Sequence, residues 1–140
     1  MKPRSNPFFR PAGFVAALAL SAGPALAAPL YWDGTDTTAN ADGGSGIWNT
    51  TTTNWDTATT GGADSAWGTS GNTNVANFGG TGGTVTLGAN LGATGAYPNS
   101  INVTAGNYII DQAGFDLSFR GSAIIVSSGA TLEIKGGTIP

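Results

Sequence analysis

The sequence predicts an all-β fold, and it favours a parallel β-helix (a β-solenoid) over an antiparallel β-sandwich. Three observations support this prediction. No apolar stripe at helical spacing persists along the chain. The 140 residues include 23 glycines, which separate short segments that alternate apolar and polar side chains. There is no cysteine, so repeated backbone pairing must supply the stability that disulfides give many small exported domains.

Residues 1–27 are predicted to be a Sec-type signal peptide. Lys2, Arg4 and Arg10 form a basic start, and residues 12–22 form an apolar run that is too short for a transmembrane helix of roughly 18 or more residues. Ala25, Leu26 and Ala27 then provide the small-x-small pattern that signal peptidase recognises. We therefore expect cleavage after Ala27 and no transmembrane span in the mature chain.

Residues 28–78 are predicted to be a Trp/Gly/Thr-rich N-terminal cap region. They contain all four tryptophans, Trp32, Trp48, Trp55 and Trp67, but almost no aliphatic periodicity. A segment so poor in aliphatic residues needs its indoles as core, and this packing role is the favoured interpretation. The alternative is that the four tryptophans are exposed and stack on sugar rings, which makes them the candidate glycan-binding residues.

Residues 79–140 are predicted to form the β-solenoid coils. Alternation predicts strands at residues 85–87, 101–103, 115–119 and 132–134, whereas residues 123–126 are apolar on both faces and suggest a buried strand. Because these segments stop close to the last residue, we expect the chain to be a truncated fragment. Its open end would then take up further coils.

The spacing of apolar residues is the argument for stacked coils. Inward positions of a solenoid recur at a fixed interval, and the interval from Phe78 to Ile101 equals that from Ile101 to Ile124 and that from Val103 to Val126. Leu87, Ile110 and Leu132 follow at nearly the same interval. A shorter rival interval, from Val103 to Leu117 to Leu132, leaves the antiparallel sandwich open.

Several motifs resemble the N-terminal passenger region of bacterial autotransporters that carry autotransporter-associated β-strand repeats. They are Trp-Asp-Gly at 32–34, Gly-Ile-Trp-Asn at 46–49, Asn-Trp at 54–55, Ala-Asn-Phe-Gly at 76–79, Ser-Ile-Asn-Val at 100–103 and Ser-Gly-Ala-Thr-Leu at 128–132. The likeness covers roughly residues 30–135. It implies a right-handed β-helix passenger at the cell surface, in the outer membrane or outside the cell, exported through or tethered by a C-terminal barrel. A truncated product without that barrel would be periplasmic.

The composition excludes several kinds of chemistry. Without histidine or cysteine, the chain has no Ser-His-Asp or Cys-His catalysis and no imidazole or thiolate metal site. After loss of the leader, two basic residues, Arg120 and Lys135, remain against eight acidic ones, for a formal charge of −6. Such a chain cannot neutralise a row of phosphates, so nucleic acid is excluded as a partner.

The acidic residues do not match a known ligand pattern. Asp33, Asp36 and Asp42 lie in a Gly/Thr/Asn loop and carry the oxygen ligands that Ca²⁺ prefers, but their spacing fits neither an EF-hand nor a glycine-rich calcium repeat. Asp and Gly in such a loop more often form Asx-turns. We therefore predict no metal site and no cofactor.

Two carboxylate pairs are candidates for glycoside cleavage, which needs two facing acids. They are Asp111 with Asp116 and Asp56 with Asp64. Polysaccharide cleavage on a β-helix also needs basic neighbours, and the mature chain has only two basic residues. A solvated surface role is favoured, so no catalytic residue is predicted.

The sequence thus predicts a non-catalytic, exported surface module, adhesin-like and part of an autotransporter passenger. Its partners would be further β-solenoid coils of a longer chain or surface glycans. The alternative is a small secreted carbohydrate-binding module that uses exposed tryptophans.

Overall fold

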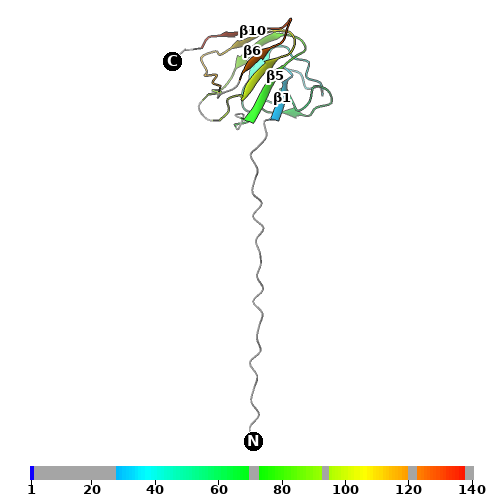
Figure 1. The fold of residues 1–140 in the computed structure, drawn as a ribbon, viewed down its shortest axis with the longest axis vertical. Helices are drawn as coiled ribbons and strands as arrows, with labels where there is room; N and C mark the ends of the chain where they lie inside the picture. Colours follow the sequence, from blue (N-terminus) through cyan, green and yellow to red (C-terminus); the bar gives the residue numbers. More distant parts are fainter. Residues whose placement is uncertain (2–27, 70–72, 93–94, 120–122, 138–140) are drawn as a thin grey trace.

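The computed structural model describes residues 1, 28–69, 73–92, 95–119 and 123–137. The predicted signal peptide, Met1 apart, lies outside them. The described residues form ten strands (Figure 1): β1 (Ala28–Trp32), β2 (Gly46–Trp48), β3 (Trp55–Asp56), β4 (Asp64–Ser65), β5 (Asn74–Phe78), β6 (Gly83–Leu87), β7 (Ser100–Val103), β8 (Asn107–Asp111), β9 (Ile124–Val126) and β10 (Thr131–Lys135). The all-β prediction is confirmed. Among these residues, no helix is long and apolar enough to cross a membrane.

The described strands form two open sheets. The larger has the order β4-β3-β1-β5-β7-β9 and the smaller has the order β10-β8-β6-β2. The larger sheet is mixed, because β1, β3 and β4 pair antiparallel while β1, β5, β7 and β9 pair parallel. The smaller sheet is parallel throughout. The antiparallel sandwich, the alternative left open by the sequence, is therefore wrong for strands β5 to β10, whose pairings are all parallel.

From β5 onward the chain alternates between the two sheets. Each strand lies beside the strand two places earlier in the sequence, so β7 pairs with β5, β8 with β6, β9 with β7 and β10 with β8. Strand β1 belongs to the same row of parallel strands as β5, β7 and β9, because it pairs parallel with β5 (Figure 1). The division between a cap at 28–78 and coils at 79–140 stays a prediction.

The observed register confirms part of the predicted spacing. Ile101 lies opposite Ile124, and Val103 lies opposite Val126, as that spacing requires. Phe78, however, lies opposite Val103 and not Ile101. A shift of two residues leaves every side chain on the same face of a strand, so alternation alone cannot detect it.

The smaller sheet shows the same two-residue shift. Ile110 lies opposite Val85 and Ile134, whereas the predicted partners were Leu87 and Leu132. Leu132 instead lies opposite Tyr108. The turns between the strands differ in length, and therefore the interval is not constant.

Two predicted segments differ from the structure. Residues 115–119 do not form a named strand, although Leu117 makes an isolated parallel bridge with Leu91. The strand at 124–126 exists, but Ile124, Ile125 and Val126 are 42%, 56% and 42% exposed instead of buried. The reason is position: β9 is the last strand of its sheet in the described residues, so no further described strand lies beyond it.

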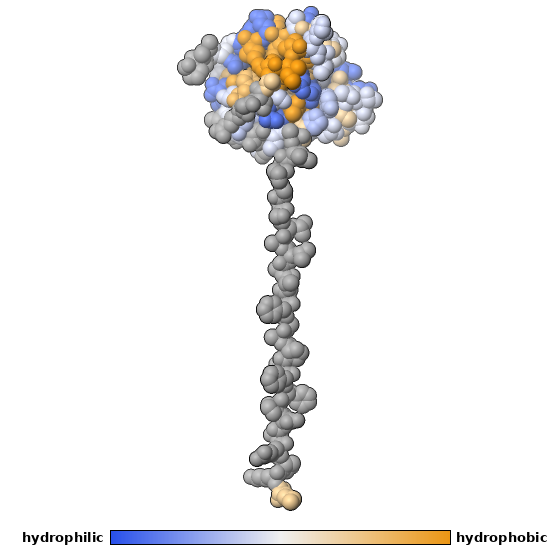
Figure 2. Space-filling model, in the orientation of Figure 1, coloured by the Kyte–Doolittle hydropathy of each residue, from blue (hydrophilic) through white to orange (hydrophobic). Residues whose placement is uncertain are grey.

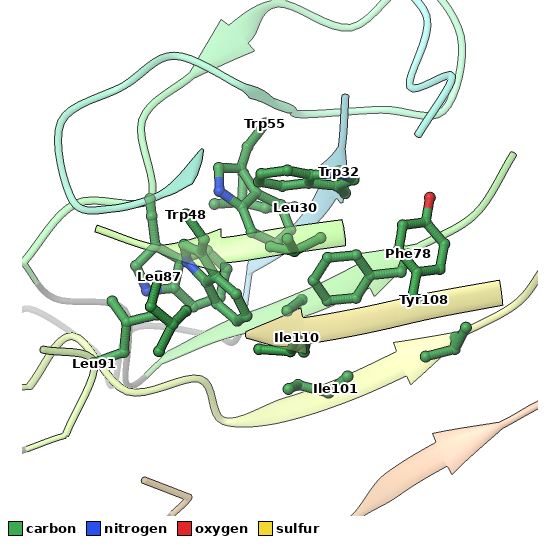
Figure 3. Close-up of a cluster of buried hydrophobic side chains, with 14 of the residues drawn as sticks. Leu30, Trp32, Trp48, Trp55, Phe78, Leu87, Leu91, Ile101, Tyr108 and Ile110 are labelled. Carbon is green, nitrogen blue, oxygen red and sulfur yellow. The ribbon is translucent and has the colours of Figure 1, made fainter. Parts of the chain in front are cut away.

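The hydrophobic core lies between the two sheets. Leu30, Ala76 and Ile101 come from the larger sheet, Val85 and Ile110 come from the smaller one, and all belong to one buried cluster (Figure 3). Strands β5 to β8 alternate between buried and more exposed positions, as expected for strands with one face on a core. The tryptophans extend this same cluster at its N-terminal end.

Candidate functional site

The four tryptophans form one aromatic cluster inside the protein. Trp32, Trp48, Trp55 and Trp67 are each at most 1% exposed. The ring centroids of Trp55 lie 5.0 Å from Trp32, 5.1 Å from Trp48 and 4.8 Å from Trp67. Phe78 adds a further contact at 5.5 Å from Trp55. Most of these pairs are edge-to-face, the arrangement that the charge distribution of aromatic rings favours.

Short strands position these rings. Trp32 of β1 lies directly opposite Trp55 of β3, and Trp48 projects from β2 in the other sheet. Two indole nitrogens also hold loops: Trp32 Nε1 donates to the carbonyl oxygen of Gly44 at 2.8 Å, and Trp67 Nε1 donates to that of Ala96 at 2.6 Å. These two bonds attach the loops at Gly44 and Ala96 to the aromatic cluster.

This geometry agrees with the packing interpretation of the tryptophans. A hollow of about 240 Å³ is lined by Trp32 with Tyr31, Ala41, Asn77 and Thr104, among others, but the Trp32 side chain has no exposed face there. Stacking on a sugar requires an accessible ring face. The glycan-binding interpretation thus receives no support from the positions of the four residues.

A second feature is an acidic cluster that comprises Asp33, Asp56 and Asp64. Each offers a carboxylate oxygen, and these oxygens lie within 4.8 Å of one another. Asp56 of β3 lies directly opposite Asp64 of β4, and Asp33 follows the end of β1. Successive residues of a strand point to opposite faces, so this cluster lies on the face of β1, β3 and β4 away from the Trp32–Trp55 pair.

Two members of the acidic cluster are buried. Asp56 is 0% and Asp33 is 1% exposed, whereas Asp64 is exposed. The Oδ1 atom of Asp33 accepts a hydrogen bond from the backbone N–H of Asp42 at 3.0 Å. Asp33 Oδ2 and both carboxylate oxygens of Asp56 accept no hydrogen bond from an N–H or hydroxyl group of the described residues, so the Asp64 carboxyl can pair with Asp56 only when the two share a proton.

Burial changes the protonation of this cluster. The pKa of Asp56 is raised from 3.8 to about 6, chiefly by burial, and the charges of Asp33 and Asp64 and a hydrogen bond with the Asp64 side chain contribute in the same direction. The pKa of Asp33 is also raised, first by burial and then by the charges of Asp36, Asp42 and Asp64, against the lowering effect of its bond from Asp42. Ionisation of Asp33 and Asp56 is therefore less favourable than ionisation of a free aspartate side chain.

The other candidate acids take different places. Asp36 Oδ1 accepts a hydrogen bond from the backbone N–H of Thr38, an Asx-turn of the kind expected for this loop. Asp111 Oδ1 accepts from the N–H of Ala113 at 3.0 Å. The Asp56–Asp64 pair is close, but a substrate cannot reach the side chain of Asp56 because it is fully buried.

The sequence does not predict the acidic cluster as a unit. Proximity along the chain groups Asp33 with Asp36 and Asp42, and it pairs Asp56 with Asp64 separately. Asp33, Asp56 and Asp64 meet because two-residue strands, β3 and β4, fold back beside β1. Such short strands give no periodic signal. One sequence feature could have linked two of these acids: Asp33 and Asp56 each directly follow a tryptophan.

A third feature is the exposed end of the parallel ladder. Ile124, Ile125 and Val126 of β9 and Ile134 of β10 are between 39% and 56% exposed. Figure 2 shows an apolar patch on this side of the molecule, where β9 lies in Figure 1. Both strands are the last of their sheets in the described residues, so one edge of each carries unpaired backbone groups.

Comparison with known proteins identifies a similar bacterial autotransporter adhesin. The chain is 38% identical over 112 residues to the "Adhesin BmaC autotransporter" of Brucella suis biovar 1 (strain 1330). The match covers 79% of this chain but 3% of that protein, so the chain spans a small part of the length of this relative. No family model matches the sequence, and no solved structure matches it. The chain is thus similar to an autotransporter adhesin, and the strand-repeat family stays a prediction.

Proposed function

We propose that this chain is a non-catalytic module of an exported, surface-displayed adhesin-like protein, in which it forms the first coils of a right-handed β-solenoid passenger. The observation that carries the proposal is the parallel ladder. Successive strands return to the same sheet at a nearly constant interval, as in Ala76 opposite Ile101 and Ile101 opposite Ile124. A chain that advances by one strand per return is the pattern of a solenoid.

Two further observations support the same proposal. The similarity to an autotransporter adhesin covers 79% of the chain. The exposed apolar strands β9 and β10 offer edges on which the next coil of a longer polypeptide would pair and bury its inward residues. The absence of histidine and cysteine from the sequence supports the non-catalytic part of the proposal.

The test is surface exposure of the native protein. An antibody against residues 28–137 would be applied to intact cells of the bacterium that encodes the chain, before and after treatment with an external protease. We expect labelling that the protease removes, and a mature N-terminus at Ala28. Labelling seen only after lysis, with residues 1–27 retained, would overturn the proposal.

Adhesion is tested separately by genetics. A strain that lacks residues 28–137 in frame would be compared with the parent strain for attachment to host cells, with surface amounts of the remaining protein matched. We expect reduced attachment. Equal attachment at equal surface amounts would contradict an adhesive role for this segment while leaving its surface location standing.

A further inference from the structure

We propose that Asp33, Asp56 and Asp64 form a binding site for one divalent cation, with Ca²⁺ as the ion that fits. The three carboxylates converge from β1, β3 and β4, with an oxygen of each within 4.8 Å of the others. An ion between three such oxygens lies within reach of all of them, since Ca²⁺ binds oxygen at roughly 2.3 to 2.6 Å. The proposal concerns a site different from the strand edges that carry the proposed function.

The unpaired oxygens of Asp56 are the observation that points to a ligand. Asp56 is 0% exposed, and in its charged form neither carboxylate oxygen accepts a hydrogen bond from a donor among the described residues. Asp33 Oδ2 is in the same situation beside it. Buried polar groups in folded proteins almost always have partners, because a buried charge without one is costly. A cation would give these three oxygens their partner.

The charge around the cluster also requires compensation. The backbone N–H groups of Asp42 and Asp36 donate to Asp33, at Oδ1 and at its carbonyl oxygen respectively, so five of the eight acidic residues of the chain gather in this region. Lys135 is the one lysine or arginine among the described residues. Its Nζ atom lies 3.6 Å from Oε1 of Glu133, on the same strand. Among the described residues, no lysine or arginine side chain is therefore paired with the cluster.

The ligand chemistry selects the ion. Carboxylate oxygens are hard ligands, which favour Ca²⁺ and Mg²⁺ over softer transition metals. With Asp33 Oδ1 held by the N–H of Asp42, the three carboxylates offer up to five oxygens, and the exposed Asp64 leaves a side open to water. This flexible, oxygen-rich environment suits the six to eight ligands of Ca²⁺, whereas Mg²⁺ requires a strict octahedron and is usually bound through one or two carboxylates.

The backbone fixes part of the site before any ion binds. The N–H of Asp33 donates to the carbonyl oxygen of Asn54 at 3.1 Å, which extends the β1–β3 pairing to the cluster. The N–H of Asp42 holds Asp33 Oδ1 at 3.0 Å, so its Oδ2 atom is the one left for a cation. Binding would thus order three carboxylates that strand pairing already brings together.

The experiment measures binding of Ca²⁺, Mg²⁺ and Tb³⁺ to the full chain after treatment with EDTA. Trp32 and Trp55 are the sequence neighbours of Asp33 and Asp56, so excitation of these indoles is expected to sensitise emission from bound Tb³⁺. We expect Ca²⁺ to compete with Tb³⁺ at a 1:1 stoichiometry, to bind at least tenfold more tightly than Mg²⁺, and to raise the melting temperature by several degrees.

Variants separate this site from non-specific acidity. Asp56→Asn and Asp64→Asn each remove one ligand charge, and we expect each to weaken Ca²⁺ binding at least tenfold. Asp116→Asn is the matched control, because Asp116 is exposed and lies outside the cluster. Asp64→Asn is the more informative variant if Asp56→Asn folds poorly, since Asp64 is already in solvent.

Two results would overturn the proposal. One is a wild-type chain whose melting temperature and Tb³⁺ emission do not respond to Ca²⁺, which would mean that a proton shared between Asp56 and Asp64 compensates the cluster. The other is an equal loss of binding in Asp116→Asn and Asp64→Asn, which would indicate diffuse attraction of cations to an acidic surface.

Discussion

At the scale of single residues, Trp55 is the side chain on which most of the N-terminal core packs. Its ring contacts three other indoles and Phe78, and it has no exposed surface. Trp55→Ala removes one of the four indoles from this cluster and leaves a cavity, so we expect a loss of about 3–5 kcal/mol in the free energy of unfolding. Guanidinium denaturation followed by far-UV circular dichroism measures it.

The control for this substitution is Thr53→Ala, because Thr53 is exposed two residues away. Its effect is expected to stay within about 0.5 kcal/mol. A Trp55→Ala variant as stable as the control would contradict the packing role. The tryptophan core could be predicted from the sequence, because residues 32–73 contain only one other large apolar side chain, Ile47.

Asp56 gives a prediction about pH, made for the chain in EDTA. Its folded pKa is about 6 against 3.8 for the free side chain. Between these two values the folded state binds more protons than the unfolded state, so the free energy of unfolding falls as the pH rises from about 3.8 to about 6. The loss is on the order of 3 kcal/mol for a shift of this size.

Asp56→Asn removes this titration, and we therefore expect it to flatten the pH dependence and to stabilise the metal-free chain at pH 7. Urea denaturation at half-unit steps of pH compares the two proteins. A wild-type chain that becomes more stable across this window would show that the carboxylate is stabilised in its charged form. Sequence patterns could not predict this titration, because it depends on burial beneath two-residue strands that periodicity does not reveal.

At the scale of elements, asparagine side chains connect neighbouring strands of the larger sheet. Asn77 of β5 donates through Nδ2 to the carbonyl oxygen of Leu30 in β1 at 3.1 Å, and its Oδ1 accepts from Asn102 Nδ2 of β7 at 3.0 Å. Asn77→Ala removes both links and leaves part-buried groups unpaired, so we expect a loss of about 1–3 kcal/mol in the free energy of unfolding.

Asn107→Ala is the matched comparison for Asn77→Ala. Asn107 of β8 accepts one hydrogen bond from Thr131 Oγ1 of β10 at 3.0 Å, but that contact is exposed. We expect thermal denaturation to shift less than half as far as in Asn77→Ala. Similar shifts would mean that the two part-buried hydrogen bonds of Asn77 stabilise the protein no more than the exposed hydrogen bond between Asn107 and Thr131.

Elements also show what alternation in a sequence can predict. Strands β6, β7 and β10 were predicted because each alternates apolar and polar residues between glycine turns. Residues 115–119 alternate equally well, yet only Leu117 finds a partner, at Leu91. Alternation indicates which face a residue would occupy, whereas pairing depends on whether another segment lies alongside.

At the scale of the whole molecule, the main contacts between strands join neighbours within each of the two sheets. The turn lengths vary, so the return from Ala76 to Ile101 is longer by two positions than the return from Ile101 to Ile124. The parallel arrangement was predictable from recurring apolar positions. The antiparallel β1–β3–β4 part was not, because residues 33–73 carry few apolar positions from which an interval could be read.

This architecture predicts a gradient of local stability along the ladders. Strands β5, β6, β7 and β8 are paired on both sides, whereas β9 and β10 are paired on one side in the described residues. In a structure whose units contact only their neighbours, terminal units open before central ones. We expect backbone amides of β9 and β10 to exchange with solvent at least tenfold faster than those of β5 and β7, a difference of about 1.4 kcal/mol in opening free energy. Native-state hydrogen exchange by NMR measures it, and uniform protection across all four strands would instead show one cooperative unit that opens as a whole.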